Sequence, residues 1–220
     1  MRGRPLIPAL SARRAALIAA LLQAWALPGA AEPQVLAVDL QASRVRIHLG
    51  RSGLLKFLGH EHTIEAPLAE GSIEVDAADF ARSRVRLRWE ARRLAVVPGT
   101  EPQNDVPDVE KRMRGPEVLD VERHPEMVFS SLAVSGAATG PGPYRLRVRG
   151  TLELLGRAHE IELPLEVRRE GEGLDATGEV ELELRALGIR PPVVAGVVKV
   201  ANRFRVAFDI RATTRQTGAE

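Results

Sequence analysis

The sequence contains no cysteine and few aromatic residues. Its 220 residues include 2 Trp, 1 Tyr and 5 Phe. The absence of cysteine excludes disulfide bonds, cysteine-ligated metals and thiol catalysis. A G-x-S-x-G nucleophile motif and glycine-rich phosphate loops are also missing. We therefore expect a binding protein rather than an enzyme.

The first residues have the layout of a secretory signal peptide. Four arginines, at positions 2, 4, 13 and 14, form a basic N-terminal region. A 12-residue apolar run follows, from Ala15 to Ala26. Gly29-Ala30-Ala31 supplies a small-residue cleavage site. The run is too short to span a bilayer. We expect residues 1–31 to be a signal peptide and residues 32–220 to be a periplasmic or secreted domain without a membrane span.

The charge of the remaining chain is close to neutral. Removing the four leader arginines leaves 27 basic and 29 acidic residues, a formal charge of −2. The basic character of the whole sequence thus belongs largely to the leader. This balance gives no electrostatic reason to expect nucleic-acid binding.

Alternation of apolar and charged residues dominates the rest of the chain, and this period of two is typical of β-strands. The alternating runs and apolar segments cover residues 45–49, 73–75, 85–89, 127–134, 146–148, 161–167, 180–184 and 204–210. They predict about eight strands in an all-β sandwich or barrel. Gly156 and Gly171 separate runs and predict hairpin turns. Gly150 and Gly178 lie inside runs and predict bulges or barrel bends.

One stretch, from Pro98 to Pro125, breaks this pattern. A short helix is predicted over residues 107–114, because Pro107 suits a helix start and Gly115 a helix stop. A second helical turn is predicted over residues 117–121. The stretch is interpreted as a long crossover, and the tail from Thr213 onward is expected to be mobile.

The apolar strand faces are predicted to point inward. A membrane barrel would present them outward, with aromatic girdles at the strand ends. Here the aromatic residues fall within strand faces, and the opposite faces are dense in Arg and Glu. An eight-stranded barrel can be filled by side chains or can hold one small ligand. The residues predicted to contact such a ligand are Val45, Ile47, Phe57, Trp89, Phe129, Leu146, Val148, Phe204 and Phe208.

Several segments together resemble the YceI-like family. Residues 117–131 resemble its L-D-x-x-x-x-P-x-x-x-F-x-S segment, residues 148–156 its G-x-L-x-x-x-G hairpin, and residues 163–167 its L-P-L-x-V strand. Leu187-Gly188-Ile189 and residues 196–210 resemble its C-terminal end, so the likeness extends over about residues 36–212. The resemblance implies an exported, extended, antiparallel eight-stranded lipocalin-like barrel that holds an isoprenoid or other amphiphilic chain.

The segment Gly59-His60-Glu61-His62 departs from the plain glycine turn of many members. It resembles a sub-branch with a GH(D/E)H signature, whose ligand need not be an isoprenoid. In an extended segment His60 and His62 project to one side, where they could bind Zn or Cu. A third ligand could come from His48, Glu65 or His124. The alternative is that both hydrogen-bond to turn backbone and water. His159, alone beside a predicted turn, is expected to be solvated.

The sequence therefore predicts an exported protein that holds an isoprenoid, lipid or other amphiphilic apolar molecule inside a β-barrel. A metal-binding or redox-associated accessory protein acting through His60 and His62 is the first alternative. A ligand-free structural or stress-related barrel is the second.

Overall fold

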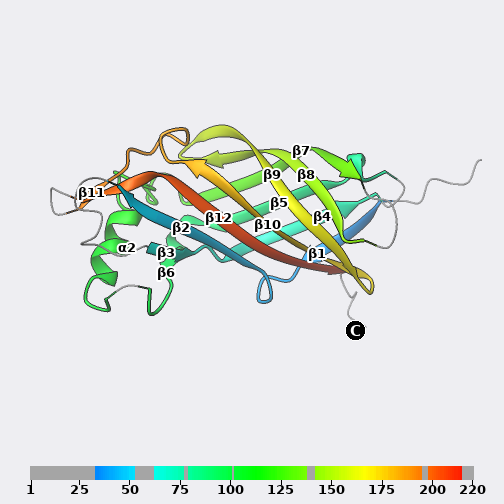
Figure 1. The fold of residues 1–220 in the computed structure, drawn as a ribbon, viewed down its shortest axis with the longest axis horizontal. Helices are drawn as coiled ribbons and strands as arrows, with labels where there is room; N and C mark the ends of the chain where they lie inside the picture. The colour runs from blue at the N-terminus through cyan, green and yellow to red at the C-terminus, as the bar shows by residue number, and fades with distance from the viewer. Residues whose placement is uncertain are drawn as a thin grey trace, which may run out of the picture. The chain divides into compact units, whose positions relative to one another are not determined.

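The computed structural model describes residues 33–52, 62–76, 79–100, 102–137, 142–194 and 198–214 (Figure 1). The strands are β1 (Gln34–Val38), β2 (Arg44–Ser52), β3 (His62–Glu65), β4 (Leu68–Val75), β5 (Arg84–Glu90), β6 (Ala95–Val96), β7 (Glu126–Ala137), β8 (Tyr144–Leu154), β9 (Arg157–Glu170), β10 (Gly173–Glu183), β11 (Val193–Val194) and β12 (Val198–Thr214). The helices are α2 (Val106–Arg114) and two 3₁₀ turns, η2 (Phe80–Arg82) and η3 (Ala91–Arg93).

These strands form a closed antiparallel barrel. The order β1-β4-β5-β7-β8-β9-β10-β12 returns to its start because β1 also pairs with β12, which confirms the predicted eight-stranded, lipocalin-like barrel. The remaining strands lengthen its wall. β2 continues β1 along the edge of β12, β3 pairs with β2, and β6 pairs with β3. The predicted crossover helix is also confirmed, as α2 between β6 and β7.

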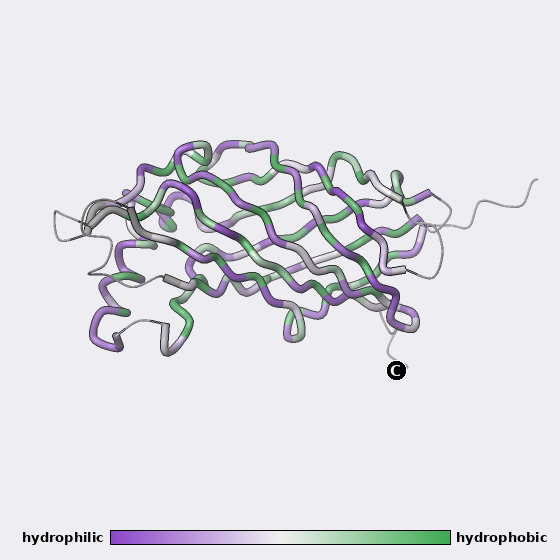
Figure 2. Tube along the Cα trace, in the orientation of Figure 1, coloured by the Kyte–Doolittle hydropathy of each residue, from purple (hydrophilic) through white to green (hydrophobic). Residues whose placement is uncertain are grey.

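Alternation along the strands places apolar residues inside the barrel. In β8 the residues Tyr144, Leu146 and Val148 are buried, and the arginines between them are exposed. Figure 2 shows the same alternation of hydrophobic and hydrophilic residues along neighbouring strands. Since adjacent side chains of a strand point to opposite faces, the inner face collects the apolar set. The prediction that these faces point inward agrees with the buried core.

The hairpin turns lie where glycines predicted them. Leu155 and Gly156 connect β8 to β9, with φ angles of 54° and 69°. Gly171, with φ of 58°, begins the turn from β9 to β10. Backbone in this left-handed region favours glycine, which explains the sequence signal at both turns.

Two expected irregularities are placed differently in the structure. A register shift does occur beside Gly150, but the extra residue is Leu132 on the partner strand β7, between Ser131 and Ala133. At Gly178 the pairing with β12 is regular. A bulge at Gly178 is therefore excluded, whereas the alternative of a barrel bend stays a prediction; the glycine makes room for a neighbouring ring.

Two further expectations are corrected. Residues 117–121 do not form a second helical turn, since the chain runs through hydrogen-bonded turns in which Asp120 adopts a φ of 42°. The tail was expected to be mobile from Thr213 onward. In the structure β12 continues to Thr214, which pairs with Leu36. Pairing with β1 holds these two residues in the wall.

Candidate functional site: an apolar cavity in the barrel

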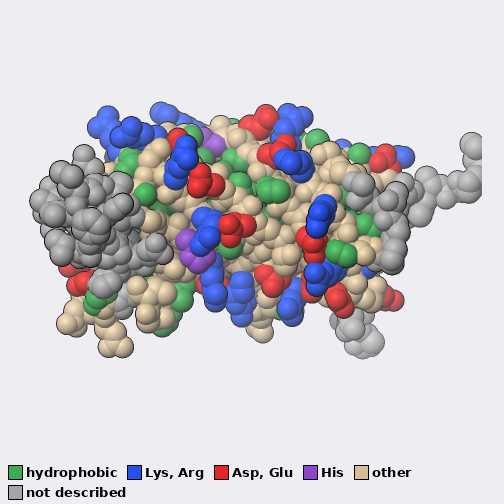
Figure 3. Space-filling model, viewed as in Figure 1, with side chains coloured by type: hydrophobic (Ala, Val, Ile, Leu, Met, Phe, Trp, Pro, Cys, Tyr) green, Lys and Arg blue, Asp and Glu red, His purple; other side chains and the backbone are tan. Residues whose placement is uncertain are grey.

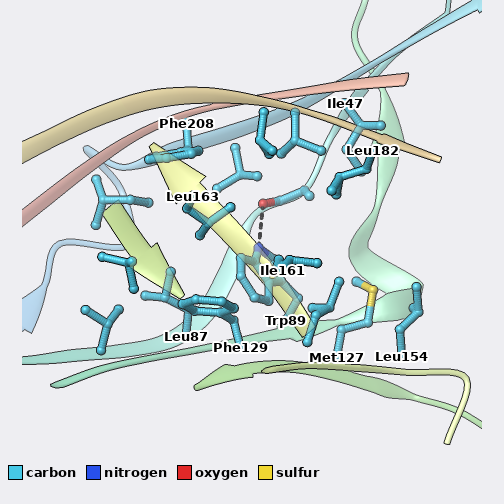
Figure 4. Close-up of a pocket in the computed structure, with 18 of the residues that line it drawn as sticks. Ile47, Leu87, Trp89, Met127, Phe129, Leu154, Ile161, Leu163, Leu182 and Phe208 are labelled. Carbon is cyan, nitrogen blue, oxygen red and sulfur yellow. Dashed lines mark hydrogen bonds between the residues drawn. The ribbon is translucent and has the colours of Figure 1, made fainter. Parts of the chain in front are cut away.

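The barrel encloses a cavity of about 270 Å³ whose described lining side chains are all apolar. Figure 4 shows side chains of the inner strand faces that line it. Segments at the α2 end of the barrel also contribute. Of the residues predicted to contact a ligand, the cavity is lined by Val45, Ile47, Trp89, Phe129, Leu146, Val148, Phe204 and Phe208. Phe57 lies outside the described residues.

The polar atom of the Trp89 indole is satisfied by the protein backbone. Its Nε1 donates a buried hydrogen bond of 3.1 Å to the carbonyl oxygen of Ala66, drawn as the dashed line in Figure 4. A buried donor without such a partner would cost free energy. Because this bond uses the N–H, the indole offers only apolar surface to a ligand.

Two phenylalanine rings lie over inward-facing glycines. A Cβ on Gly150 would overlap the ring of Phe129, and a Cβ on Gly178 would overlap the ring of Phe208. The rings can therefore lie against the barrel wall where glycine leaves space. Alternation alone does not predict these two ring–glycine contacts. The available sequence signal was the presence of a glycine inside each strand pattern.

The cavity wall is packed unevenly. Phe129 on β7 is only 2% exposed and Val148 on β8 5%. The inward-facing Ile161 of β9, Leu182 of β10 and Val206 of β12 are only partly buried. Partly buried lining residues also occur on β7 and β8, at Met127 and Leu152, so buried and partly buried positions are found around the whole barrel.

The ladder between β9 and β10 ends partway along β9. Pairing runs from Gly173 opposite Glu170 to Gly178 opposite Leu165. The next residue of β9, Pro164, has its carbonyl oxygen against Gly178, so its backbone faces β10. Proline has no N–H to donate to a ladder. The remaining part of β9, residues 157–163, pairs with β8.

The two ends of the cavity are built differently. At the end where β5 begins, the rings of Phe80 and Tyr144 lie 5.6 Å apart at a tilt of 46°. At the α2 end, the cavity is lined by residues outside the regular strands. These are Leu94, Met113, Val118, Leu119, Leu184, Leu187 and Ile189. The sequence analysis did not assign them to the site. Apart from Leu184, which ends the predicted run 180–184, they lie outside the alternating runs, where a period of two gives no orientation.

The outer face of the barrel carries cross-strand ion pairs. Arg147 and Glu162 are 2.8 Å apart, and Arg149 and Glu160 are 3.1 Å apart. Figure 3 shows basic and acidic side chains interspersed over the visible face. Arg88 lies between two acids, and its hydrogen bond to Glu70 raises the pKa of its guanidinium. These charges are directed to solvent and do not line the cavity.

The predicted metal pair, His60 and His62, lies largely outside the described residues. His60 lies outside the described residues, and for His62 only the backbone is described, in β3 opposite Leu49. The ring of His48, named as a third ligand, approaches the hydroxyl of Thr63 instead, at 3.3 Å. Within the described ranges no group of three His, Cys, Asp or Glu side chains could hold a metal ion.

The expectation that His159 is solvated is wrong. Its Nε2 atom is buried and has no hydrogen-bond partner among the described residues. His159 precedes Ile161 by two residues on β9 and pairs with Leu152 of β8, so it shares their inward face. Nearness to the hairpin turn suggested solvent, but the position on the strand decides the direction of the side chain.

Comparisons with known proteins agree with this architecture. The YceI-like domain matches residues 36–212. The structure is similar to that of BcnA from Burkholderia cenocepacia, with 18% identity, a TM-score of 0.58, and coverage of 80% of this chain and 99% of that chain. It is also similar to a polyisoprenoid binding domain from Saccharophagus degradans implicated in plant cell wall breakdown, with 14% identity, a TM-score of 0.55, and coverage of 81% and 98%.

A third similar structure is a YceI protein from Campylobacter jejuni, with 11% identity, a TM-score of 0.51, and coverage of 66% of this chain and 81% of that chain. No curated protein matches the chain. Among the described residues, no helix has the length and apolar character needed to cross a bilayer. The GH(D/E)H sub-branch stays a prediction. Because the YceI-like domain matches most of the sequence, the chain belongs to the YceI-like family.

Proposed function

We propose that this protein is an exported carrier that holds an isoprenoid, lipid or other amphiphilic apolar molecule inside its barrel. The observation that carries the proposal is the cavity, whose described lining side chains are apolar throughout. Apolar ligands are recognised mainly by removal of their surface from water. Burying about ten methylene groups contributes roughly 8 kcal/mol before ordering and association costs are subtracted.

An unfilled cavity of this size also disfavours the ligand-free alternative. At about 24 cal/mol per Å³, a void of 270 Å³ costs on the order of 6 kcal/mol. This cost is comparable with the whole stability of an ordinary domain. A bound apolar molecule would recover the contacts that the lining side chains lack.

Similarity to known structures also supports a binding role. A neighbour with the same fold is a polyisoprenoid binding domain. We extend apolar-ligand binding to this chain because its own cavity has suitable walls. The described lining contains no nucleophile or paired carboxylates, which supports binding rather than catalysis.

The proposed location is the periplasm or the exterior of the cell. It rests on the basic start, the apolar run from Ala15 to Ala26 and the small residues Gly29-Ala30-Ala31. Sequencing the N-terminus of protein recovered from the cell envelope tests it. A new N-terminus near Glu32 is expected, and recovery of the uncleaved chain in the cytoplasm would contradict export.

Native mass spectrometry of the protein purified from its own cell envelope tests the carrier proposal directly. We expect a non-covalent adduct with the mass of a lipid or isoprenoid, released by organic extraction. If no adduct is found, and the extracted protein also fails to bind farnesol in calorimetry, the carrier proposal is wrong and the ligand-free barrel is favoured.

A charge placed on the inner face provides the matched variant test. Val206 lines the cavity, so Val206→Arg buries a cation and should abolish ligand uptake or folding. Arg86 is exposed on the outer face, where it donates to the hydroxyl of Ser130, and Arg86→Ala should change stability by less than about 0.5 kcal/mol. Normal uptake by a folded Val206→Arg protein would contradict the assignment of the inner face.

A further inference from the structure

The wall between β9 and β10 is complete along only part of its length. Pairing ends at Gly178 opposite Leu165, although β9 continues to pair with β8 and β10 with β12. Among the described residues, no backbone hydrogen bond joins residues 157–163 of β9 to residues 179–183 of β10. Figure 1 shows the two strands separating toward the α2 end. We call this unpaired stretch of the wall, between residues 157–163 and 179–183, the slot.

Acidic side chains occupy both edges of the slot. If the register of β9 and β10 continued, Glu162 would lie directly opposite Glu181, and Glu160 directly opposite Glu183. All four residues are exposed. Like charges directly opposite each other destabilise a pair of strands. The sequence therefore disfavours closing the slot by further pairing.

The same acids face arginines on the other side of each strand. Glu162 lies opposite Arg149 of β8, and Glu181 lies opposite Arg205 of β12. Opposite charges at facing positions stabilise neighbouring strands. In both of these ladders the pairing continues past the acid. The charges therefore favour pairing on the far sides of the two strands and oppose it across the slot.

Apolar side chains line the slot on its inner side. Leu163 of β9 and Val180 of β10 would be opposite each other if the register continued, and both line the cavity. They are only partly buried, whereas Val167, in the paired part of β9, is buried. The next facing positions toward the α2 end, Ile161 and Leu182, are also partly buried and line the cavity. A molecule crossing the wall here would meet apolar side chains continuous with the cavity lining.

Both ends of the cavity are covered by buried side chains among the described residues. At the α2 end these are Leu94, Leu119 and Ile189. At the other end Tyr144 is buried, and its ring packs against that of Phe80. A ligand that entered at either end would have to displace these packed side chains, whereas at the slot no backbone pairing has to be broken.

We propose that the apolar ligand enters and leaves the cavity through the slot, between Leu163 of β9 and Val180 of β10. This inference rests on the proposed carrier function. A polar head group can stay outside, among the exposed charges, because the described lining of the cavity offers it no polar side chain. The tail is then buried against the lining, and its removal from water drives binding.

A reversible bridge across the slot tests this proposal. The chain has no cysteine, so Glu162→Cys combined with Glu181→Cys introduces the only two thiols. A short bis-methanethiosulfonate reagent joins them on the outer face, intact mass confirms the bridge, and dithiothreitol removes it. Farnesol uptake and release are followed by stopped-flow fluorescence of Trp89, which lines the cavity and is the only tryptophan after residue 31. The bridge should slow both rates at least about tenfold, because the strands can no longer part to admit the chain, and reduction should restore them.

A bridge across a complete ladder is the matched control. Glu181→Cys combined with Arg205→Cys places two thiols at directly opposite positions of β10 and β12. Joining them with the same reagent should leave both rates unchanged. Before bridging, each double variant should bind farnesol as the wild type does, which verifies that it is folded.

Reversal of one charge is a second test that needs no bridge. Glu181→Lys places a cation opposite Glu162, so the two edges attract each other, and farnesol uptake should slow by about two- to threefold. High salt should restore the rate, because it screens exposed charges. Glu70→Lys is the control, since it also removes a cross-strand ion pair, with Arg88, but lies on β4. Its uptake rate should equal that of the wild type.

The outcomes separate this inference from the proposed function. If the wild-type protein does not bind farnesol, both are wrong. If it binds farnesol, and neither the bridge across the slot nor Glu181→Lys changes the rates, the slot is not the entrance and the carrier function stands. Equal slowing by the two bridges would also overturn the inference, because a general stiffening of the barrel would then limit entry.

Discussion

At the scale of single residues, the clearest structural requirement is the absence of a side chain at Gly178. A Cβ there would overlap the ring of Phe208 and the carbonyl of Pro164. We predict that Gly178→Ala lowers the free energy of unfolding by about 1–3 kcal/mol through overpacking, measured by urea denaturation. Gly50→Ala is the control, because its nearest neighbour would be the Cβ of Ala201 at 3.8 Å.

Replacing Phe208 by a smaller side chain should relieve the part of this strain that comes from the ring, while the overlap with the Pro164 carbonyl remains. Gly178→Ala combined with Phe208→Leu is expected to be less unstable than the sum of the single changes, since both act at one contact. Equal stabilities of Gly178→Ala and Gly50→Ala would show that the ring moves aside without cost.

Much of the inner face could be predicted residue by residue from parity. Trp89, Phe129 and Val148 line the cavity because alternate positions of a strand share a face. The same rule, applied to His159, would have placed it inside, two residues before Ile161. The nearness of His159 to a turn does not determine the direction of its side chain. The absence of a partner for its Nε2 could not be predicted, because it depends on side chains from distant parts of the chain.

At the scale of elements, the strands with long alternating runs were predictable and the short ones were not. β3 has four residues and β6 two, so neither contains enough alternation to be recognised. Their role becomes clear only in the folded barrel, where β2, β3 and β6 extend the wall beyond β1, β4 and β5. Closure depends on long-range pairing of β1 with β12, which no local pattern encodes.

An acidic side chain of the crossover helix hydrogen-bonds to the barrel wall, beside a second bond of 3.0 Å from Arg114 of α2 to the carbonyl of Leu94. Glu110 of α2 accepts a hydrogen bond of 3.0 Å from the backbone N–H of Val96 in β6 and lies 3.1 Å from Arg114. Glu110→Ala would leave that N–H without its acceptor, so we predict a loss of about 1–3 kcal/mol in urea denaturation. Glu117→Ala, at an exposed position of the same crossover, should change stability by less than about 0.5 kcal/mol. Equal effects of the two changes would contradict the attachment.

The incomplete ladder between β9 and β10 should be visible in hydrogen exchange. Residues 165–167 of β9 pair on both sides, whereas residues 157–163 pair with β8 alone. Exchange should therefore be faster in the segment 157–163, because alternate amides there have no ladder acceptor. Bound farnesol should slow it if the ligand lies against this wall. Equal protection of both segments would show that the ladder continues past Pro164.

At the scale of the whole molecule, the charges and the cavity contribute in different ways. The ion pairs of the barrel are exposed, for example Arg147–Glu162 with more than half of the arginine side chain accessible. Pairs of this kind contribute about 0–1 kcal/mol each and are weakened by salt. The apolar lining is insensitive to salt but depends on what fills the cavity. The stability of the protein should consequently respond to ligand more strongly than to ionic strength.

This difference can be measured by thermal unfolding of extracted protein. A ligand at a free concentration of about 100 times its Kd stabilises the folded state by about 2.7 kcal/mol. For a domain of this size each kcal/mol raises the Tm by roughly 2–4 °C, so saturating farnesol should raise it by about 5–11 °C. Raising the salt concentration without farnesol is the control and should produce a smaller shift. An unchanged Tm with farnesol, together with a large dependence on salt, would show that the surface charges rather than a bound apolar molecule stabilise the barrel.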